Sequence, residues 1–462
     1  MEREDKKTIV VTIFHSLISK NILNTDALKI LQNSKDYRII LLVPALKKDF
    51  FEQYYSDENT YIEGIDMQIL ERNQVEKFMH TVSRLLIDTH YLDYKRHELL
   101  DLDRSFGGWF RHLFRQSVVR LFADNSVSRH VFHLCDRILP RTEIFQQILE
   151  KYNPSCVFST DLFEQMGNQL IREARKRGIG TVGMVRSWDN CLSKGLLRNT
   201  PDVIIVNNSV IKQELIIIHG VKDDIINIVG LPQFDSFLQK KPEERTHFFK
   251  KNNLDPQKKL VMFAPGGNVL SDTDGDICKI LSDAKKSGRL PQDIQFFIRN
   301  HPQHPADLSG VEGESDFTIQ TPGRVLDRKN QKETELTPDD QEFLRNILAH
   351  TDVLIWVATS LCLDALVYSV PQVVVNFDGF KLKDYYHSVK RYHDEDHMKK
   401  MFALKPFRVA NTAEDLIAYI DMYLKDTSVD RKERAMAKEQ QLFVTDGFAG
   451  ERIAEILKRQ ST

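Results

Sequence analysis

Short apolar runs alternate along the chain with segments in which apolar residues recur every three or four positions. The first runs are Lys7–Phe14 and Arg38–Val43, and the segment between them, Ser19–Asn33, has helical spacing. Unbroken apolar runs of this length are typical of strands buried on both faces of a parallel sheet. The alternation therefore predicts a doubly wound α/β fold.

The rhythm resumes later in the first half of the chain and again in the second half. In the first half, strands are predicted at Cys156–Ser159, Gly180–Val185, Asp202–Val206 and Ile225–Val229, and helices at Leu162–Arg177 and Val210–His219. In the second half, strands are predicted at Lys259–Ala264, Ile294–Arg299, Asp352–Val357 and Gln372–Asn376, and helices at Asp276–Lys286, Asp339–Ala349 and Leu361–Tyr368. Three helices then end the chain, the last at Gly450–Lys458. The polar segment Gln239–Gln257 separates the halves, and we interpret it as an interdomain connection.

This pattern predicts two Rossmann-like domains that face each other across a cleft. We assign residues 1–235 to the first domain and residues 236–445 to the second. In open parallel sheets, ligands bind outside the carboxyl ends of the strands. The loops that follow the predicted strands are therefore where chemistry is expected.

One long segment, Asn73–Pro140, interrupts the rhythm and is predicted to be a helical insertion. It contains four arginines interleaved with apolar side chains, namely Arg104, Arg111, Arg115 and Arg120 with Phe106, Trp109, Phe110, Phe114, Val118 and Phe122. A basic amphipathic helix can lie on a membrane surface or hold a lipid-linked acceptor, here through residues 104–122. The commoner arrangement, in which the aromatic side chains pack inward and the arginines are solvated, is the interpretation that we favour from the sequence.

Composition narrows the class of protein. The 462 residues include 64 Lys and Arg against 66 Asp and Glu, so the net charge is 64 − 66 = −2 and nothing in it favours nucleic acid. The five cysteines are scattered without a C-x-x-C spacing, which suits a reducing compartment. No unbroken apolar stretch reaches the roughly 20 residues that span a bilayer. We expect a cytoplasmic protein. A further expectation is that residues 104–122 make peripheral contact with the inner face of the membrane.

Several familiar motifs are missing or weak. The sequence has no P-loop, no G-x-G-x-x-G after the first strand of either half and no G-x-S-x-G elbow. His393 and His397 have the spacing of a helical zinc site, but a solvated helix face is the favoured interpretation. Asp272–Asp276 resembles a calcium loop whose glycine is at the wrong position. We therefore expect no metal requirement and no cofactor.

The loops after the second-half strands converge on phosphate binding. Gly266, Gly267 and Asn268 follow one strand, Arg299 and His301 lie at the end of the next, and Thr359 and Ser360 begin a helix after a third, with Asp364 one turn further. Glycine amides, cations and helix N-termini all stabilise anions. Together these residues are the candidate donor-binding set, although each alone has an ordinary structural explanation.

Particular stretches resemble the GT-B glycosyltransferase superfamily, in its surface and capsular polysaccharide branch related to CDP-glycerol glycerophosphotransferases. They are Ser187–Asn190 with Lys194-Gly195, Pro201–Asn207, His219–Val221, Val229–Asp235, Arg299–Pro302, Thr359–Asp364, Phe377–Gly379 and Asp446–Arg452. The resemblance implies donor binding in the second domain, acceptor binding in the first, and a final helix within 446–462 that crosses back to the first domain. It also implies that His301-Pro302 and Thr359-Ser360 contact the donor phosphate and that Asp364 stands where such enzymes often have Glu.

The catalytic base is expected from the first domain. His15, Asp161 and Asp189 each follow a predicted strand, where a base can take the proton of an acceptor hydroxyl, although a loop histidine and turn-capping acids would look the same. The expected reaction is metal-independent, inverting transfer of a sugar from a nucleotide-activated donor to a surface polysaccharide or lipid-linked glycan. A CDP- or CMP-linked donor is one form of it. A CDP-polyol phosphotransferase, a non-hydrolysing nucleotide-sugar 2-epimerase and a non-catalytic binder remain as alternatives.

Overall fold

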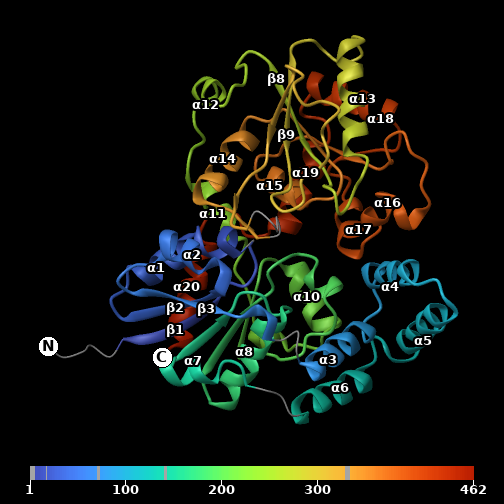
Figure 1. The fold of residues 1–462 in the computed structure, drawn as a ribbon. Helices are drawn as coiled ribbons and strands as arrows, with labels where there is room; N and C mark the ends of the chain where they lie inside the picture. The colour runs from blue at the N-terminus through green and yellow to red at the C-terminus, as the bar shows by residue number, and fades with distance from the viewer. Residues whose placement is uncertain (1–5, 17, 70–72, 140–142, 328–332) are drawn as a thin grey trace. The chain divides into compact units, whose positions relative to one another are not determined.

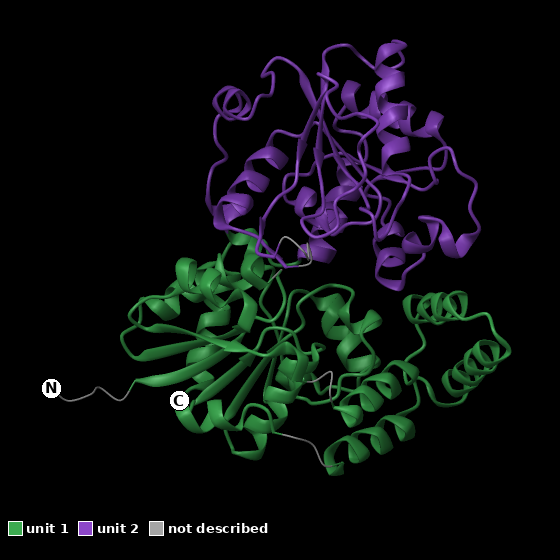
Figure 2. Cartoon of the chain, in the orientation of Figure 1, with its two compact units in different colours: residues 1–235, 443–462 green, residues 236–442 purple. Residues whose placement is uncertain are grey.

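The computed structural model describes residues 6–16, 18–69, 73–139, 143–327 and 333–462. The chain forms two compact units, shown in Figure 2. Unit 1 comprises Met1–Asp235 and Phe443–Thr462, and unit 2 comprises Ser236–Leu442. Each unit contains a parallel sheet with helices packed against it (Figure 1), which confirms the predicted α/β class.

Unit 1 is built on a seven-stranded sheet in the order β3-β2-β1-β4-β5-β6-β7. Its strands are β1 (Lys7–Thr12), β2 (Tyr37–Pro44), β3 (Thr60–Ile65), β4 (Cys156–Ser159), β5 (Gly180–Met184), β6 (Val203–Val206) and β7 (Ile226–Ile228). Its helices outside the insertion are α1 (Asp26–Gln32), α2 (Lys48–Tyr55), α7 (Gln146–Tyr152), α8 (Gln165–Lys176), α9 (Asn190–Ser193), α10 (Ser209–Ile217) and α20 (Ala449–Gln460). All neighbouring strands are parallel, and Ile9 in β1 pairs with both Ile39 and Cys156. The strand order therefore reverses between β1 and β4, which is where such sheets place ligands.

Unit 2 repeats the plan with a six-stranded sheet in the order β10-β9-β8-β13-β14-β15. Its strands are β8 (Lys259–Ala264), β9 (Ile294–Arg299), β10 (Phe317–Gln320), β13 (Val353–Trp356), β14 (Gln372–Val375) and β15 (Arg408–Ala410), beside a small pair, β11 (Arg324–Val325) and β12 (Thr334–Glu335). Its helices are α11 (Asp235–Gln239), α12 (Arg245–Lys251), α13 (Asp274–Lys286), α14 (Pro338–Ala349), α15 (Leu361–Val367), α16 (Lys390–His393), α17 (Asp396–Phe402), α18 (Ala413–Lys425) and α19 (Arg431–Leu442). Here the order reverses between β8 and β13.

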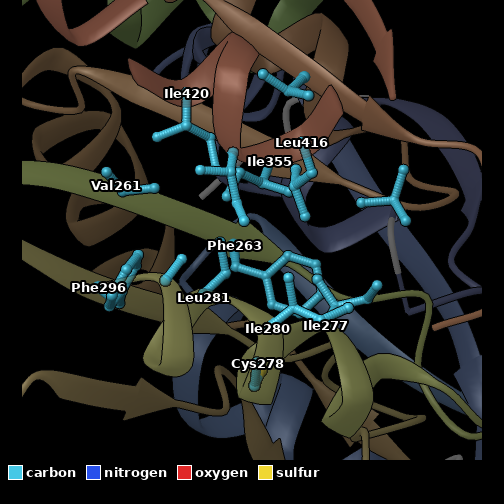
Figure 3. Close-up of a cluster of buried hydrophobic side chains, with 14 of the residues drawn as sticks. Val261, Phe263, Ile277, Cys278, Ile280, Leu281, Phe296, Ile355, Leu416 and Ile420 are labelled. Atoms are coloured by element: carbon cyan, nitrogen blue, oxygen red, sulfur yellow. The ribbon is translucent and has the colours of Figure 1, made fainter. Parts of the chain in front are cut away.

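The core of unit 2 explains why its strands read as continuous apolar runs. Val261 and Phe263 of β8, together with Ile355 of β13, pack against Leu281 of α13 and Ile420 of α18, as Figure 3 shows. The other face of the sheet is covered as well, since Phe297 of β9 is buried and its ring lies 5.7 Å from that of Phe343 on helix α14. A strand covered on both faces has no solvent-facing positions, so its pattern does not alternate.

A contact within unit 1 fixes the point where the chain leaves and the point where it returns. The carboxylate of Asp235 accepts hydrogen bonds from the backbone N–H groups of Ala449 and Gly450, at 3.1 and 2.7 Å, at the start of α20. A Cβ on Gly450 would lie 2.8 Å from the backbone nitrogen of Ala27, so the close approach of α20 to α1 requires glycine. The stretches around Asp235 and Gly450, which carried part of the family resemblance, thus have a structural role.

The predicted helical insertion is present as four helices of unit 1. They are α3 (Gln74–Leu85), α4 (His90–Leu102), α5 (Phe106–Phe122) and α6 (Ser126–Ile138), while Pro140 lies outside the described residues. Arg198, which is buried, pairs with Glu76 of α3 at 2.8 Å and with Asp136 of α6 at 2.9 Å. The insertion is therefore attached to the segment that follows α9.

The expectation that the aromatic side chains of this insertion pack inward is wrong. Phe106 is 89% exposed, Phe110 65% and Phe114 60%. Helix α5 is instead held through the side on which Gly108, His112 and Val119 are buried. A Cβ on Gly108 would lie 1.8 Å from the carbonyl oxygen of Asp103, so only a glycine permits this packing. The apolar side of α5 is left facing solvent.

Two further differences from the sequence prediction concern connections and edges. The polar segment interpreted as an interdomain connection, Gln239–Gln257, belongs to unit 2 and contains helix α12, whose Phe248 and Phe249 are buried. The elements that the sequence patterns missed include strands β3, β10 and β15 and helices α2, α7, α16 and α17. Within the residues that the structure describes, no helix has the length and apolarity needed to cross a membrane.

Candidate functional site

Three loops of unit 2 leave the carboxyl ends of neighbouring strands β9, β8 and β13. They carry the predicted donor-binding residues: Gly266–Asn268 follows β8, His301 follows β9, and Thr359 and Ser360 follow β13. The glycine loop and the histidine loop touch, because a Cβ on Gly267 would lie only 2.0 Å from the carbonyl oxygen of His304. Gly267 also has a φ of +74°, which only glycine adopts at little cost. The sheet thus brings these candidate residues to one edge.

The glycine amides are not open to an external anion, contrary to the expectation from the sequence. The N–H groups of Gly266 and Gly267 donate to the two carboxylate oxygens of Asp274, at 3.1 and 2.9 Å. Burial raises the pKa of Asp274 to about 6, although these two hydrogen bonds favour the ionised form. The loop is an anion-binding turn whose anion is a side chain of the protein. Asn268, the third residue of the predicted set, is exposed beside it.

His301 has the geometry of a neutral hydrogen-bond donor. The backbone N–H of Gln303 donates to its Nδ1 at 3.1 Å, so the ring proton of the neutral form is on Nε2. Burial, together with the neighbouring His304, lowers the pKa of His301 to about 4, so the ring is neutral near pH 7. The rings of His301 and His304 stack with centroids 5.1 Å apart. This stacking fixes the direction in which the Nε2–H points.

Arg299 is a buried member of the edge rather than an exposed cation. Its guanidinium donates to Oε1 of Gln320 on β10 and lies 5.9 Å from the ring centroid of Phe343. Burial lowers the pKa of Arg299 to about 10, while the charges of Asp340 and Asp364 act in the opposite direction. Asp364 itself is buried in α15. Arg299 therefore supplies a fixed positive charge beneath the loops, balanced in part by two carboxylates.

Thr359 and Ser360 differ in their surroundings. The hydroxyl of Thr359 accepts a hydrogen bond from the N–H of Leu361 at 3.2 Å, at the start of the seven-residue helix α15. Ser360 is exposed, and its side chain makes no capping hydrogen bond. The two hydroxyls are therefore not an equivalent pair: Thr359 caps the turn and Ser360 faces solvent.

The three candidate bases lie at the corresponding edge of unit 1. Asp161, after β4, is buried: its carboxylate pairs with Arg186 at 2.7 Å and accepts the N–H of Phe163 at 3.0 Å. Asp189 precedes the short helix α9 without a capping side-chain hydrogen bond, and its carboxylate accepts hydrogen bonds from the hydroxyls of Ser187 and Ser193. Asp161 is thus committed to local structure, and Asp189 is largely so.

His15 follows β1, next to the reversal of strand order. Burial lowers its pKa to about 3, and the charges of Arg186, Lys194 and Lys47 act in the same direction, whereas Asp189 opposes them. The imidazole is therefore neutral near pH 7, and these surroundings make it a weak base.

Two residues at these edges were missed by the sequence analysis. Glu164, five positions after β4 ends, accepts the N–H of Gly167 at the start of α8, and burial raises its pKa to about 7. Asp274 lies in the acidic stretch that we compared with a calcium loop. Their signals were present in the sequence, since an acid before a helix is typical of an N-cap and an acid after two glycines is a natural partner for their amides.

The two weak metal motifs have other roles. His393 lies in α16 and His397 in α17, so they do not share one helix face, and His393 is buried with its Nε2 2.8 Å from the carbonyl oxygen of Val357. The expectation of a solvated helix face is thus wrong for His393. In the acidic loop, Asp272 pairs with Lys381 and Lys383. Across the described ranges, no group of three or more His, Cys, Asp or Glu side chains is arranged to hold a metal ion.

The family model described as CDP-Glycerol:Poly(glycerophosphate) glycerophosphotransferase matches residues 178–458, which is more than half of the chain. The chain belongs to this family. As a member it is a group-transferring enzyme. The match includes Asp189 and the whole edge of unit 2, whereas His15, Asp161 and Glu164 precede it.

Solved structures show the same two-domain GT-B fold. A variant of the wall teichoic acid polymerase TagF soaked with CDPG is 14% identical over 100% of this chain and 91% of its own, with a TM-score of 0.54. A putative UDP-N-acetylglucosamine 2-epimerase from Listeria monocytogenes is 11% identical over 98% of this chain and 96% of its own, with a TM-score of 0.57. The UDP-GlcNAc 2-epimerase from Neisseria meningitidis bound to UDP-GlcNAc is 10% identical over 98% of this chain and 100% of its own, with a TM-score of 0.56. Curated protein sequences give no match.

Proposed function

We propose that this enzyme transfers a polyol-phosphate unit from a CDP-activated donor to a hydroxyl group of a surface polysaccharide or lipid-linked glycan. The observation that carries the proposal is the family match, whose description names a CDP-linked donor and a phosphotransfer. The match covers every residue of the unit 2 edge that was expected to bind a donor. Nothing in the proposed reaction requires a metal ion or a cofactor.

Unit 2 is the proposed donor-binding unit. His301 presents a neutral Nε2–H, Ser360 an exposed hydroxyl and Asn268 an exposed amide, on adjoining loops at one sheet edge. Each is a donor able to bond a phosphate oxygen, and a hydrogen bond to a charged group contributes about 1.5–3 kcal/mol. The buried charge of Arg299 lies beneath them. These groups would stabilise the negative charge that builds up on the leaving phosphate.

Unit 1 is the proposed source of the base. The acceptor hydroxyl oxygen forms a bond to the phosphorus atom of the donor while the bond from phosphorus to the bridging oxygen breaks, and CMP leaves with that electron pair. The hydroxyl proton passes to the base. Among the predicted residues His15 is the best suited, because Asp161 is tied to Arg186 and Asp189 to two serine hydroxyls. Asp189 would then stabilise the imidazolium.

Sugar transfer from a nucleotide-activated sugar is the second candidate. The placement of His301, Thr359 and Ser360 at one sheet edge favours it, because these are the residues that the resemblance to GT-B glycosyltransferases assigns to the donor phosphate. In that reaction the acceptor oxygen attacks the anomeric carbon in a single displacement and the configuration is inverted. A 2-epimerase would need no acceptor at all.

Donor turnover with and without acceptor tests the proposal. The purified chain is incubated with CDP-glycerol, a CMP-sugar or UDP-GlcNAc, each with and without a hydroxyl-bearing glycan acceptor, and products are separated by chromatography. We expect CMP release from CDP-glycerol that depends on the acceptor and survives a chelator. Acceptor-dependent turnover of a sugar donor alone would favour the second candidate. Conversion of UDP-GlcNAc without acceptor, or binding without any turnover, would contradict both.

The exposed side of α5 is the proposed site of peripheral contact with the cytoplasmic membrane. Phe106, Phe110 and Phe114 are solvent-exposed there, flanked by Arg104 and Arg111, which are 69% and 56% exposed and pair with Asp101 and Asp103. Apolar side chains that insert at the lipid boundary, bordered by arginines that meet anionic headgroups, are typical of interfacial helices. A lipid-linked acceptor would be reached from this position.

Vesicle co-sedimentation tests the membrane contact. We expect binding to phosphatidylcholine vesicles containing an anionic lipid, weakened about tenfold or more by the double substitution Phe110→Ser with Phe114→Ser, since each half-exposed aromatic loses about 1 kcal/mol of transfer free energy. Tyr61→Ser, at an aromatic residue of β3 that is 47% exposed, is the control and leaves binding unchanged. Equal binding of all three proteins, or no binding at all, would contradict the proposal.

A further inference from the structure

The loop that follows β13 carries two hydroxyls of the candidate donor site, and it starts at Val357. Val357 is buried and comes directly after β13. Its backbone N–H donates to the carbonyl oxygen of Ala264, the last residue of β8, at 3.3 Å. Its carbonyl oxygen needs a donor as well, because a buried carbonyl group without a hydrogen bond is costly.

That donor is a histidine from a separate helix. His393, the last residue of α16, places its Nε2 2.8 Å from the carbonyl oxygen of Val357. The residue is 6% exposed. Its ring packs edge-to-face with that of Trp356 on β13, with centroids 6.1 Å apart, and lies 5.5 Å from the ring of Phe402 on α17. The imidazole is therefore held by hydrogen bonds and by two aromatic neighbours.

The second ring nitrogen of His393 faces a carboxamide. Nδ1 lies 2.8 Å from Oδ1 of Asn376, whose own carboxamide is 2.8 Å from that of Asn411. Burial lowers the pKa of His393 despite the opposing charge of Asp394, so the neutral ring has one N–H to donate. The carbonyl oxygen of Val357 can only accept, whereas a carboxamide can donate or accept. The proton is therefore assigned to Nε2, and the carboxamide of Asn376 turns its NH2 group to Nδ1.

Helix α16 is itself attached to the loop that follows β14. The carboxylate of Asp378, a buried residue of this loop, accepts the N–H of Val389 at 2.9 Å, and Val389 immediately precedes α16. Strands β13 and β14 are neighbours in the sheet. His393 thus joins two adjoining loops at the edge where the donor is proposed to bind.

We infer that His393 is a positioning residue for donor binding, because its hydrogen bond to Val357 fixes the start of the loop that presents Ser360 to the donor phosphate. The inference rests on the proposed function, which assigns Ser360 that contact. Packing alone does not require a histidine here. An apolar side chain would fill the space beside Trp356 and Phe402 without two buried nitrogens to satisfy.

The contacts inside the loop show why its start matters. The hydroxyl of Thr359 accepts the N–H of Leu361, and the side chain of Ser360 makes no capping hydrogen bond. The direction of the Ser360 hydroxyl therefore depends on the backbone that carries it, and this backbone starts at Val357. A displacement of about 1 Å in a group that orients a substrate can cost about 10²-fold in rate.

Two substitutions at this position separate the hydrogen bond from the packing. The amide nitrogen of a glutamine reaches the position of a histidine Nε2, and that of an asparagine reaches the position of Nδ1. His393→Gln therefore keeps a donor for Val357, whereas His393→Asn loses it. His350→Asn is the matched control, because Nε2 of His350 lies 2.8 Å from the carbonyl oxygen of Glu243 and His350 precedes β13, at the opposite end of that strand.

Isothermal titration with CDP, chemical denaturation and turnover are measured on the full chain. We expect His393→Asn to weaken CDP binding about tenfold and His393→Gln to stay within about threefold of the parent. His350→Asn should lose stability as His393→Asn does, but should leave CDP affinity unchanged. In turnover, His393→Asn should raise the KM for the donor and lower kcat, while the KM for the acceptor stays the same.

Asn376→Ala keeps the inference testable if His393→Asn fails to fold. Asn376 is half-buried, and its substitution removes the group that holds Nδ1 of the imidazole. We expect CDP binding about threefold weaker than in the parent. Unchanged CDP affinity in His393→Asn, or in Asn376→Ala where only that variant folds, would overturn the positioning role.

Two further results would also overturn it. Equal weakening in His393→Gln and His393→Asn would mean that the packing of the imidazole, and not its bond to Val357, supports CDP binding. Equal weakening in His350→Asn would mean that CDP affinity follows the general stability of unit 2.

The proposed function fails on different results. If the variants bind CDP as expected but no protein turns over CDP-glycerol, the positioning role stands and the transferase proposal fails. If the parent binds CMP or UDP instead of CDP, the proposed donor is wrong, and the same variants are compared with that nucleotide. A parent that binds none of the three would overturn both.

Discussion

The two sheets are built by the same rules, yet their carboxyl edges have different chemistry. In unit 2, the anion-binding turn at Gly266 and Gly267 is filled by the carboxylate of Asp274, and Arg299 is held by Gln320. In unit 1, three cations act on one neutral imidazole, His15. In the first edge the carboxylate partners lie on the glycine amides, whereas in the second the charges of Lys47, Arg186 and Lys194 act on a single imidazole, although Arg186 is itself paired with Asp161.

The difference separates what topology decides from what the loops decide. Parallel strands bring the loops to one edge in both units, whatever residues those loops contain. The loops then decide whether the edge offers neutral donors, as His301 does, or a field of positive charge, as Lys47 and Lys194 do. An internally satisfied edge suits a ligand held by a few directed hydrogen bonds, and a charged edge suits one held by its net charge.

The comparison is tested most severely at His15. We expect His15→Gln to lower kcat by about 10²–10⁴-fold, because the amide cannot accept the hydroxyl proton, and to leave the affinity for CDP unchanged. His130→Gln, at an exposed histidine of α6, is the control. Turnover and CDP binding, measured on the same preparations, test this prediction. Parallel losses of both would show that the two edges do not have separate roles.

His301→Gln is expected to have the next largest effect. Removing the oriented Nε2–H should lower kcat by about 10²–10³-fold and, unlike the change at His15, should also weaken CDP binding. His247→Gln, at a histidine of unit 2 whose side chain is 72% exposed, controls for loss of an imidazole. Isothermal titration with CDP measures the affinity for CDP, and turnover assays measure kcat. Full CDP affinity in His301→Gln would remove this residue from the donor site.

Much of the fold follows from the sequence pattern because most strands are buried on both faces. The predicted runs Cys156–Ser159, Lys259–Ala264 and Ile294–Arg299 coincide with β4, β8 and β9. Three of the missed strands, β3, β10 and β15, lie at sheet edges: β3 has both buried and exposed positions, and β10 and β15 have four and three residues. Edge strands are covered on fewer sides, so they carry no long apolar run.

The site was less predictable because partners come from distant positions. The rule that loops follow strands placed the candidate residues at the correct edges. It did not indicate that Asp274 would occupy the amides of Gly266 and Gly267, or that Arg299 would bond Gln320 on the neighbouring strand β10. Such pairings depend on side-chain packing after the strands have assembled. The exposed side of α5 was missed for a similar reason, since Gly108 decided which side of the helix is buried.

The close contact between the glycine and histidine loops makes a third prediction. Gly267→Ala places a Cβ against the carbonyl of His304, at a residue whose φ is +74°. Gly288→Ala has the same unfavourable positive φ, +73°, but its Cβ would have no atom within 4 Å. We expect Gly288→Ala to cost about 1 kcal/mol and Gly267→Ala about 3 kcal/mol or more. Chemical denaturation measures both. Equal costs would mean that the loops are not packed together as described.

The smallest expected effect concerns Asp274, the internal anion that distinguishes the unit 2 edge. Its pKa is raised to about 6 in the folded protein, above the ordinary value of 3.8, so the folded state binds the extra proton between these values. Stability that depends on this group therefore falls as pH rises from about 4 to about 6 and is constant above.

Asp274→Asn lacks this dependence on pH. Its stability relative to the parent should therefore improve by about 1–2 kcal/mol as pH rises from about 4 to about 6, in addition to a constant loss from the weakened hydrogen bonds. Chemical denaturation at several pH values measures the free energy of unfolding, and the transition followed is the one that Gly267→Ala lowers. Asp283→Asn, at an exposed position on α13, is the control for a lost negative charge. A difference that does not change with pH would mean that the carboxylate is as easily ionised inside the turn as in water, and the contrast between the two edges would lose its electrostatic basis.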